Sequence, residues 1–194
     1  SNVTGLDIDF AIVTDTEALR ELVNILGGVE IYETKYKTYQ FYQYYATIVP
    51  GSNILNGEEV LAYVGCRDVC GSDFDRMKNQ QKVLISIKDK IISLNLLTRP
   101  NKLLEILDTI GKHIQTDIPL SEIKVVSSVL SNIDFSNIKQ VFFDTSPDGL
   151  LYSKNLYGMY VLLPTKGDFS EIQDKCLNIF ESTQEKNVNL KGVE

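Results

Sequence analysis

The sequence predicts an α/β fold with three layers, α/β/α, built around a central mixed sheet. Strand-like and helix-like segments alternate in the first part of the chain, helices then follow one another, and strand patterns return before the last helix. Hydrophobic residues make up 43% of the 194 residues, which is enough to form a buried core. We expect one domain over residues 1–181 and a polar, aperiodic tail over residues 182–194.

The first elements are predicted to be two strands with a helix between them. Residues 6–13 alternate and then become apolar, as in a strand that enters a sheet. Thr14 and Glu17 have the spacing of a capping box, and the glycines at positions 27–28 indicate the end of the helix. Residues 29–33 are then expected to form a short strand.

Residues 32–49 are rich in tyrosine. Aromatic residues that nearly alternate with polar ones favour a hairpin or an edge strand. We interpret these aromatic side chains as ordinary sheet packing, with one wall of a lipid or glycan site as the alternative. A turn is expected at residues 50–53, where proline and glycine occur together.

A polar turn over residues 65–72 connects two predicted helices. The first begins after Asn56, which has Glu59 at capping-box spacing. The second begins at Ser72 or Asp73 and is expected to be long, ending near residue 97. Its buried face is predicted to include Met77, Leu84, Ile87 and Ile91.

The last part of the chain is predicted to contain three helices and two strands. One helix has Pro100 in its first turn, where proline is tolerated, and another follows Ser121 to about residue 131. Residues 139–144 and 156–163 have strand patterns, and Ser170 begins the final helix.

Charge and composition exclude several classes of function. A net charge of −7 argues against general binding of nucleic acid, which depends on a basic surface. No apolar run approaches the roughly 20 residues of a membrane-spanning helix, and no signal peptide is apparent at the start. Three cysteines and one histidine are too few for a structural zinc site.

The cysteines and the histidine have predicted environments of their own. Cys66 and Cys70 flank the turn residue Arg67, and we interpret them as free thiols, with a small disulfide that stiffens the turn as the alternative. His113 is expected at the surface near a helix end, with no partner identifiable in the sequence.

Three polar residues cluster where the turn meets the long helix. Arg67 lies in the turn, and Arg76 and Gln80 are four residues apart, on one face of the helix. Fixed donors near a helix N-terminus form an anion site, so we expect phosphate or pyrophosphate as the ligand. The alternative is a surface salt-bridge cluster of Arg67, Asp73 and Arg76.

This segment resembles the signature of the LytR-CpsA-Psr (LCP) family of cell-envelope proteins, L-x-G-x-x-A-L-x-Y-x-R-x-R followed by D-x-x-R-x-x-R-Q-Q. The segments GLDIDFAIV, LVNILGGVEI, IQTDIPLSEI and VLLP also fit the family, so that the resemblance covers roughly residues 4–180. The matching positions of the signature are Leu55, Gly57, Leu61, Tyr63, Arg67, Asp73, Arg76, Gln80 and Gln81.

The resemblance implies an LCP-like fold and a function at the extracytoplasmic face of a bacterial cell membrane. Proteins of this family are membrane-anchored and transfer glycopolymers from a polyprenyl-pyrophosphate carrier to peptidoglycan or protein. By position, Arg67 and Arg76 would be catalytic residues that hold the pyrophosphate, with Asp73 orienting an arginine and Gln80 as a further ligand. The family also implies Mg²⁺, whose ligands are expected outside this sequence.

Several positions depart from the family pattern. Gly65 and Asn79 stand where arginines are expected, and Asn24 replaces an aspartate. The N-terminal part of the family domain, with its metal-binding aspartates, a further arginine and the membrane anchor, is not found in this sequence. Each lost cation removes charge-assisted hydrogen bonds of about 1.5–3 kcal/mol.

These departures argue against catalysis by this chain alone. One alternative is a catalytically inactive relative that binds a lipid, an anionic polymer or a protein during cell-envelope assembly. Another is a purely structural interaction domain, in which Arg67 and Arg76 share no pocket.

Overall fold

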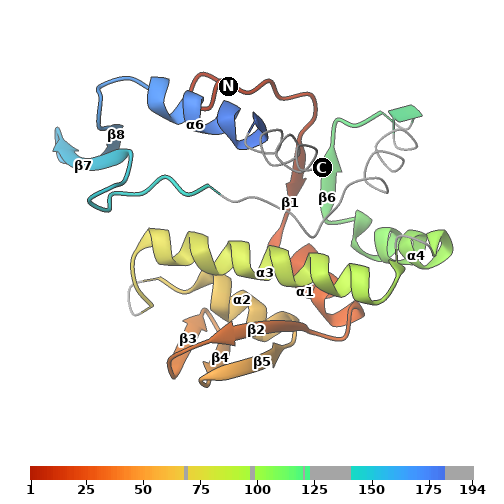
Figure 1. Cartoon of the computed structure of the whole chain (residues 1–194). Helices are drawn as coiled ribbons and strands as arrows, with labels where there is room; N and C mark the ends of the chain where they lie inside the picture. The colour runs from red at the N-terminus through yellow and green to blue at the C-terminus, as the bar shows by residue number, and fades with distance from the viewer. Residues whose placement is uncertain (68–69, 97–98, 120, 123–140, 182–194) are drawn as a thin grey trace, which may run out of the picture. The chain divides into compact units, whose positions relative to one another are not determined.

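The structure is a computed structural model, and its fold is α/β, as the sequence predicts (Figure 1). In place of the single mixed sheet that was expected, the described strands pair as four two-stranded antiparallel sheets. The chain divides into two compact units, one of residues 10–133 and one that combines residues 1–9 with 134–194. The structure describes residues 1–67, 70–96, 99–119, 121–122 and 141–181.

The unit of residues 10–133 contains four helices and three strand pairs among its described residues. The helices are α1 (Thr16–Ile25), α2 (Gly57–Gly65), α3 (Asp73–Ser93) and α4 (Pro100–Gly111). The strand pairs are β1 (Ile12–Thr14) with β6 (Ile114–Thr116), β2 (Val29–Glu33) with β5 (Gly51–Leu55), and β3 (Lys37–Phe41) with β4 (Tyr44–Ile48).

Helix α2 is the centre of the hydrophobic core in this unit. It packs against α1, α3, β3 and β4, and Figure 1 shows it between α3 and the pairs β2–β5 and β3–β4. Every residue from Val60 to Val64 is buried, as expected for a helix that is apolar all round. The predicted capping box of Asn56 and Glu59 is confirmed at its start. The core therefore fixes the end of α2, where the polar turn begins.

Helix α3 begins as predicted but buries a different face. Ser72 is its N-cap and forms a capping box with Asp75. Val83 and Ile87 are buried, whereas Leu84 is 63% exposed, so its assignment to the core is wrong. Leu84 follows Val83 by one residue and therefore points about 100° away from it around the helix. Helix α3 ends at Ser93, four residues before the predicted end.

The start of α1 also differs from the prediction. Its N-cap is Asp15, whose carboxylate accepts a hydrogen bond from the Ala18 N–H at 2.9 Å, so the predicted cap Thr14 is wrong. Thr14 instead ends the short strand β1, and residues 6–11 are not in a strand.

The tyrosine-rich segment forms the predicted hairpin, β3–β4, with Tyr42 in its turn at a φ of 50°. Tyr39 packs into the core, in agreement with sheet packing, while Tyr42 and Tyr45 are exposed. The turn expected at residues 50–53 is wrong, because β5 already begins at Gly51. The side chain of Asn53 closes the short connection by bonding to the backbone of Val49.

The second unit contains β7 (Leu151–Leu156), β8 (Met159–Pro164) and α6 (Ser170–Glu181). The start of α6 was predicted correctly, as was the proline start of α4. The strand predicted at residues 156–163 corresponds to β8, but it begins only at Met159, because Tyr157 and Gly158 have φ values of 53° and 83° and turn the chain between β7 and β8.

Some predictions lie partly or wholly outside the described residues. The tail over residues 182–194 does so, as does most of the helix predicted after Ser121. The described part of the strand predicted at 139–144, residues 141–144, is neither helix nor strand. Within the described residues, no helix is long and apolar enough to cross a membrane.

Candidate anion-binding site

A cavity of about 240 Å³ lies at the turn between α2 and α3. It is lined by Cys66, Arg67, Gly71, Ser72, Asp73 and Arg76. The structure thus brings together three of the four predicted site residues, and Gln80 is not in the lining. The cavity is smaller than the roughly 300–1,000 Å³ of a pocket that encloses a drug-sized ligand, so its size suits an anionic headgroup.

Arg76 is held firmly in the first turn of α3. Its Nη2 lies 2.5 Å from Oδ1 of Asp73. The Arg76 side chain is only 18% exposed, and its buried Nε has no hydrogen-bond partner in the described part of the chain. Asp73 therefore orients the guanidinium and leaves donors free for an anion.

Arg67 is held differently, because it lies in the turn and is exposed. Its backbone carbonyl accepts a hydrogen bond from the Cys70 N–H at 3.1 Å. Among the described residues, its guanidinium has no ion pair and no hydrogen bond. Since Asp73 is paired with Arg76, none of the described carboxylates is paired with the Arg67 side chain.

The two cysteines of the turn form a disulfide, so the interpretation as free thiols is wrong. Cys66 and Cys70 are bonded, with 5.8 Å between their Cα atoms, a distance that suits a disulfide. Strand β3 holds this bridge from one side, since Lys37 donates to the Cys70 carbonyl and the Gln40 N–H contacts the Cys66 sulfur at 3.5 Å. The third cysteine, Cys176, is free and buried.

The start of α3 forms part of the same wall of the cavity, and a capping box satisfies two of its backbone N–H groups. The Ser72 Oγ accepts the Asp75 N–H at 3.2 Å, and the Asp75 carboxylate accepts the Ser72 N–H at 2.8 Å. Hydrogen bonds from the Ser72 side chain and backbone lower the pKa of Asp75. In a helix the first N–H groups have no internal partner, so the positive end of the α3 dipole faces the cavity.

The other motif residues of α3 serve the contact between helices. Gln80 donates from Nε2 to the carbonyl of Val64 at 3.4 Å, near the C-terminal end of α2. Asn79 is buried and donates to the carbonyl of Tyr63 at 3.3 Å. The role of Gln80 as a substrate ligand stays a prediction, and Asn79 adds no cation to the cavity.

Gly65, the other position without the expected arginine, is covered by an aromatic ring. A Cβ atom on Gly65 would lie 2.4 Å from Cγ of Phe41. The ring of Phe41 in turn packs edge-to-face with Tyr42, with their centroids 4.6 Å apart. The space next to Gly65 is therefore apolar and filled by the β3–β4 hairpin.

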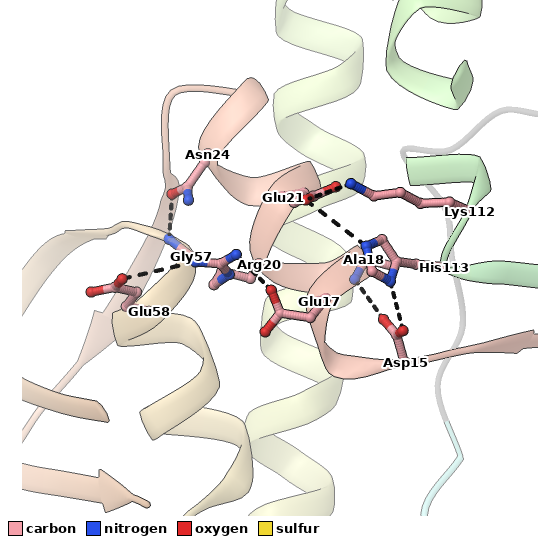
Figure 2. Close-up of polar contacts among 10 residues, drawn as sticks. All are labelled: Asp15, Glu17, Ala18, Arg20, Glu21, Asn24, Gly57, Glu58, Lys112 and His113. Carbon is pink, nitrogen blue, oxygen red and sulfur yellow. Dashed lines mark hydrogen bonds and ion pairs between the residues drawn. The ribbon is translucent and has the colours of Figure 1, made fainter. Parts of the chain in front are cut away.

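Asn24, where the family has aspartate, links α1 to α2 (Figure 2). Its Oδ1 accepts the N–H of Gly57 at 2.8 Å. The helices approach so closely there that a Cβ on Gly57 would lie 2.3 Å from the carbonyl oxygen of Arg20. Two separate family segments thus meet at one helix contact, which explains Gly57 by packing and makes Asn24 a hydrogen-bond acceptor.

The partner of His113, which the sequence did not reveal, is Asp15 (Figure 2). The His113 Nδ1 lies 2.7 Å from Oδ2 of Asp15, and its Nε2 lies 3.9 Å from Oε1 of Glu21. The expectation of no partner is therefore wrong, although His113 does follow the end of α4. The backbone N–H of Ala18 and then the ring of His113 lower the pKa of Asp15.

The described residues do not fit a Mg²⁺ site. They contain no cluster of three or more histidine, cysteine, aspartate or glutamate side chains that could hold a metal ion. At the cavity the lining carboxylate is Asp73, which is paired with Arg76. Magnesium needs an octahedral set of oxygen ligands, and these residues do not offer one.

Comparisons with curated proteins identify relatives, one of which is named as a teichoic acid transferase. The chain is 28% identical over 154 residues to the polyisoprenyl-teichoic acid–peptidoglycan teichoic acid transferase TagT of Bacillus subtilis, covering 77% of this chain and 47% of TagT. It is 28% identical over 127 residues to the biofilm regulatory protein A of Streptococcus mutans, covering 62% of this chain and 30% of that protein. The chain thus spans less than half of each of these relatives.

Solved structures share the fold. Protein gbs0355 of Streptococcus agalactiae superposes with a TM-score of 0.71 at 22% identity, covering 90% of this chain and 58% of that one. TagV of B. subtilis superposes with a TM-score of 0.67 at 19% identity, covering 90% and 65%. The model of the LytR_cpsA_psr family matches residues 1–177, and the chain therefore belongs to the LytR-CpsA-Psr family.

Proposed function

We propose that the cavity between α2 and α3 binds the pyrophosphate of a polyprenyl-linked glycopolymer, and that the protein to which this chain belongs transfers the polymer to peptidoglycan or protein. The observation that carries the proposal is that Arg67 and Arg76 line one small cavity at the start of a helix. Relatives named as teichoic acid transferases support the type of substrate.

In the proposed reaction, a hydroxyl of the acceptor attacks the phosphorus that carries the glycopolymer. The bond from that phosphorus to the bridging oxygen breaks, polyprenyl phosphate leaves, and the proton of the attacking hydroxyl passes to the leaving phosphate or to solvent. Arg67 and Arg76 would neutralise the charge that develops on the leaving phosphate, assisted by the N-terminus of α3. Mg²⁺, which the family resemblance implies, would need oxygen ligands other than the described residues, and no step is assigned to it.

The alternative function is a catalytically inactive member that binds the carrier or an anionic polymer. Two specific observations favour it. Phe41 fills the space next to Gly65, and the buried Asn79 donates to the carbonyl of Tyr63. Positions 65 and 79 therefore supply no cation to the cavity. A site with two arginines would still attract a diphosphate, but it would stabilise the transition state less than a site with four.

Binding of a short polyprenyl pyrophosphate, measured by calorimetry with and without Mg²⁺, tests the site. Since a hydrogen bond to a charged group contributes about 1.5–3 kcal/mol, Arg67→Ala and Arg76→Ala should each weaken binding at least about tenfold. The matched control is Arg99→Ala, which removes the same charge outside the cavity and should leave affinity unchanged.

The outcomes separate the two functions. Equal affinity of the wild type and Arg76→Ala would refute a pyrophosphate site at this cavity. If the arginine variants lose binding, a transfer assay with a lipid-linked glycopolymer and a peptidoglycan acceptor decides between the functions. Product formation that depends on Arg76 supports the transferase, and tight binding without product supports the inactive relative.

A further inference from the structure

The two arginines of the cavity are held in place by different means. Arg76 is part of α3, and its guanidinium is paired with Asp73 at 2.5 Å. Arg67 lies outside any helix and has no side-chain partner among the described residues. The direction of its guanidinium therefore depends on the backbone of the turn that carries it.

The disulfide of Cys66 and Cys70 closes this turn around Arg67. Cys66 is the C-cap of α2, and its N–H donates to the carbonyl of Ala62 at 3.2 Å. Cys70 is fixed through its own carbonyl, which accepts a hydrogen bond from Lys37. One covalent bond and the hydrogen bond from the Cys70 N–H to the Arg67 carbonyl thus restrain the backbone next to the guanidinium.

The position of the bridge suits a permanent restraint. Cys66 and Cys70 are only 3% and 4% exposed, so the sulfur atoms are shielded from thiol reagents. Cys66 also lines the cavity beside Arg67, so the bridge and the cation share one wall.

We propose that the Cys66–Cys70 disulfide is a positioning element for Arg67, which orders the guanidinium before a phosphate binds; this inference rests on the proposed function of the cavity. A restrained turn lowers the conformational entropy that is lost on binding. Opening the bridge should therefore weaken the contribution of Arg67 and leave that of Arg76 intact, because α3 and Asp73 hold Arg76 independently.

A double-mutant cycle tests this coupling with inorganic pyrophosphate as the probe. Cys66→Ser/Cys70→Ser should bind about tenfold more weakly than the wild type. Arg67→Ala should cost about tenfold in the bridged protein and less than about twofold in the opened one, because its contact is already lost. Arg76→Ala should cost the same in both backgrounds. An equal loss for Arg67→Ala in both backgrounds would overturn the proposal.

A second readout does not require that pyrophosphate binds. The chain has four arginines, so NMR relaxation of labelled arginine δ-methylene groups resolves each side chain. The Arg67 signal should become more mobile when the bridge is opened, while the Arg76 signal stays unchanged. If the serine variant does not fold, Cys66→Ala/Cys70→Ala is measured instead, because alanine suits the two buried positions.

The two readouts separate this inference from the proposed function. A wild type that fails to bind pyrophosphate counts against the function alone, and the relaxation data then decide on the positioning role. Unchanged mobility of Arg67 in the opened protein would overturn that role. Increased mobility of Arg67 and Arg76 together would also overturn it, because it would show general loosening of the fold.

Discussion

The ring of Phe41 lies directly against Gly65, with 2.4 Å between its Cγ and the place where a Cβ on Gly65 would be. The two residues belong to β3 and to the last turn of α2. No side chain fits at position 65 while the ring is there. Packing therefore requires glycine at position 65, and the ring leaves no room near the cavity for the arginine that the family has there.

This contact predicts that Gly65→Ala changes stability in opposite directions with and without the Phe41 ring. Gly65→Ala should destabilise the wild type by about 1–3 kcal/mol, because the added methyl group overpacks against the ring. In a Phe41→Ala background the same change should stabilise by up to about 1 kcal/mol, since alanine favours the helix. Urea denaturation of the four proteins measures the coupling. Equal effects of Gly65→Ala in both backgrounds would contradict the contact.

The starts of α2 and α3 were predicted well because their determinants lie within a few residues of each other, whereas the cap of α1 was placed one residue too early. Asn56 with Glu59 and Ser72 with Asp75 form capping boxes that are readable in the sequence. Strand β5 was missed because its pairing with β2 depends on residues about twenty positions away. A proline and a glycine in its vicinity suggested a turn, and only the tertiary pairing overrides that signal.

The candidate site was predictable to a similar extent. The spacing of Asp73 and Arg76 and the turn position of Arg67 placed these side chains near one helix start, and the structure finds them around one cavity. The contact of Gln80 with Val64 was not predictable, because it depends on how α3 crosses α2. The cover that Phe41 forms over Gly65 joins residues 24 positions apart, and no local pattern indicates it.

The link between Asn24 and Gly57 predicts how α1 stabilises the start of α2. Asn24→Ala should lower the free energy of unfolding by about 1 kcal/mol, because the N–H of Gly57 loses its acceptor. Asn24→Asp keeps the acceptor and places a negative charge at a helix N-terminus, so it should be neutral or stabilise by about 0.3–1 kcal/mol. Thermal unfolding compares the variants, and an aspartate variant as unstable as the alanine one would argue against this role.

Tyr63 and Glu33 form a buried polar link between α2 and β2. The hydroxyl of Tyr63, which is 0% exposed, donates to Glu33, and Lys82 of α3 lies 2.5 Å from the same carboxylate. Burial would raise the pKa of Glu33, but the hydrogen bonds from Lys82 and Tyr63 outweigh it and lower that pKa. Burial, and then the bond to Glu33, raise the pKa of Tyr63.

This link predicts that removing the Tyr63 hydroxyl lowers the stability of the fold markedly. Tyr63→Phe should destabilise by about 1.5–3 kcal/mol, because Glu33 loses a donor in a partly buried site. Tyr45→Phe is the matched control, since the Tyr45 hydroxyl bonds to Gln40 at the surface, and its effect should stay within about 0.5 kcal/mol. Denaturant unfolding measures both. Similar small effects in both variants would show that the Tyr63 hydroxyl contributes little.

Asp15 predicts a dependence of stability on acid pH. The folded state lowers its pKa below 3.8, chiefly through the N–H of Ala18 and then through His113. A carboxyl with a lowered pKa stabilises the fold above its unfolded value, and this contribution is lost as the pH falls through the folded value. The free energy of unfolding of the wild type should therefore decrease below about pH 4.

Asp15→Asn should remove part of that decrease, because an amide does not titrate in this range. The slope of the free energy of unfolding against pH, measured between about pH 2 and 5, should be smaller in Asp15→Asn than in the wild type. His113→Gln keeps the hydrogen bond from Ala18 to Asp15, which is the larger cause, and should therefore give an intermediate slope. If Asp15→Asn and the wild type had the same slope, the cap and the histidine would not favour the ionised carboxylate.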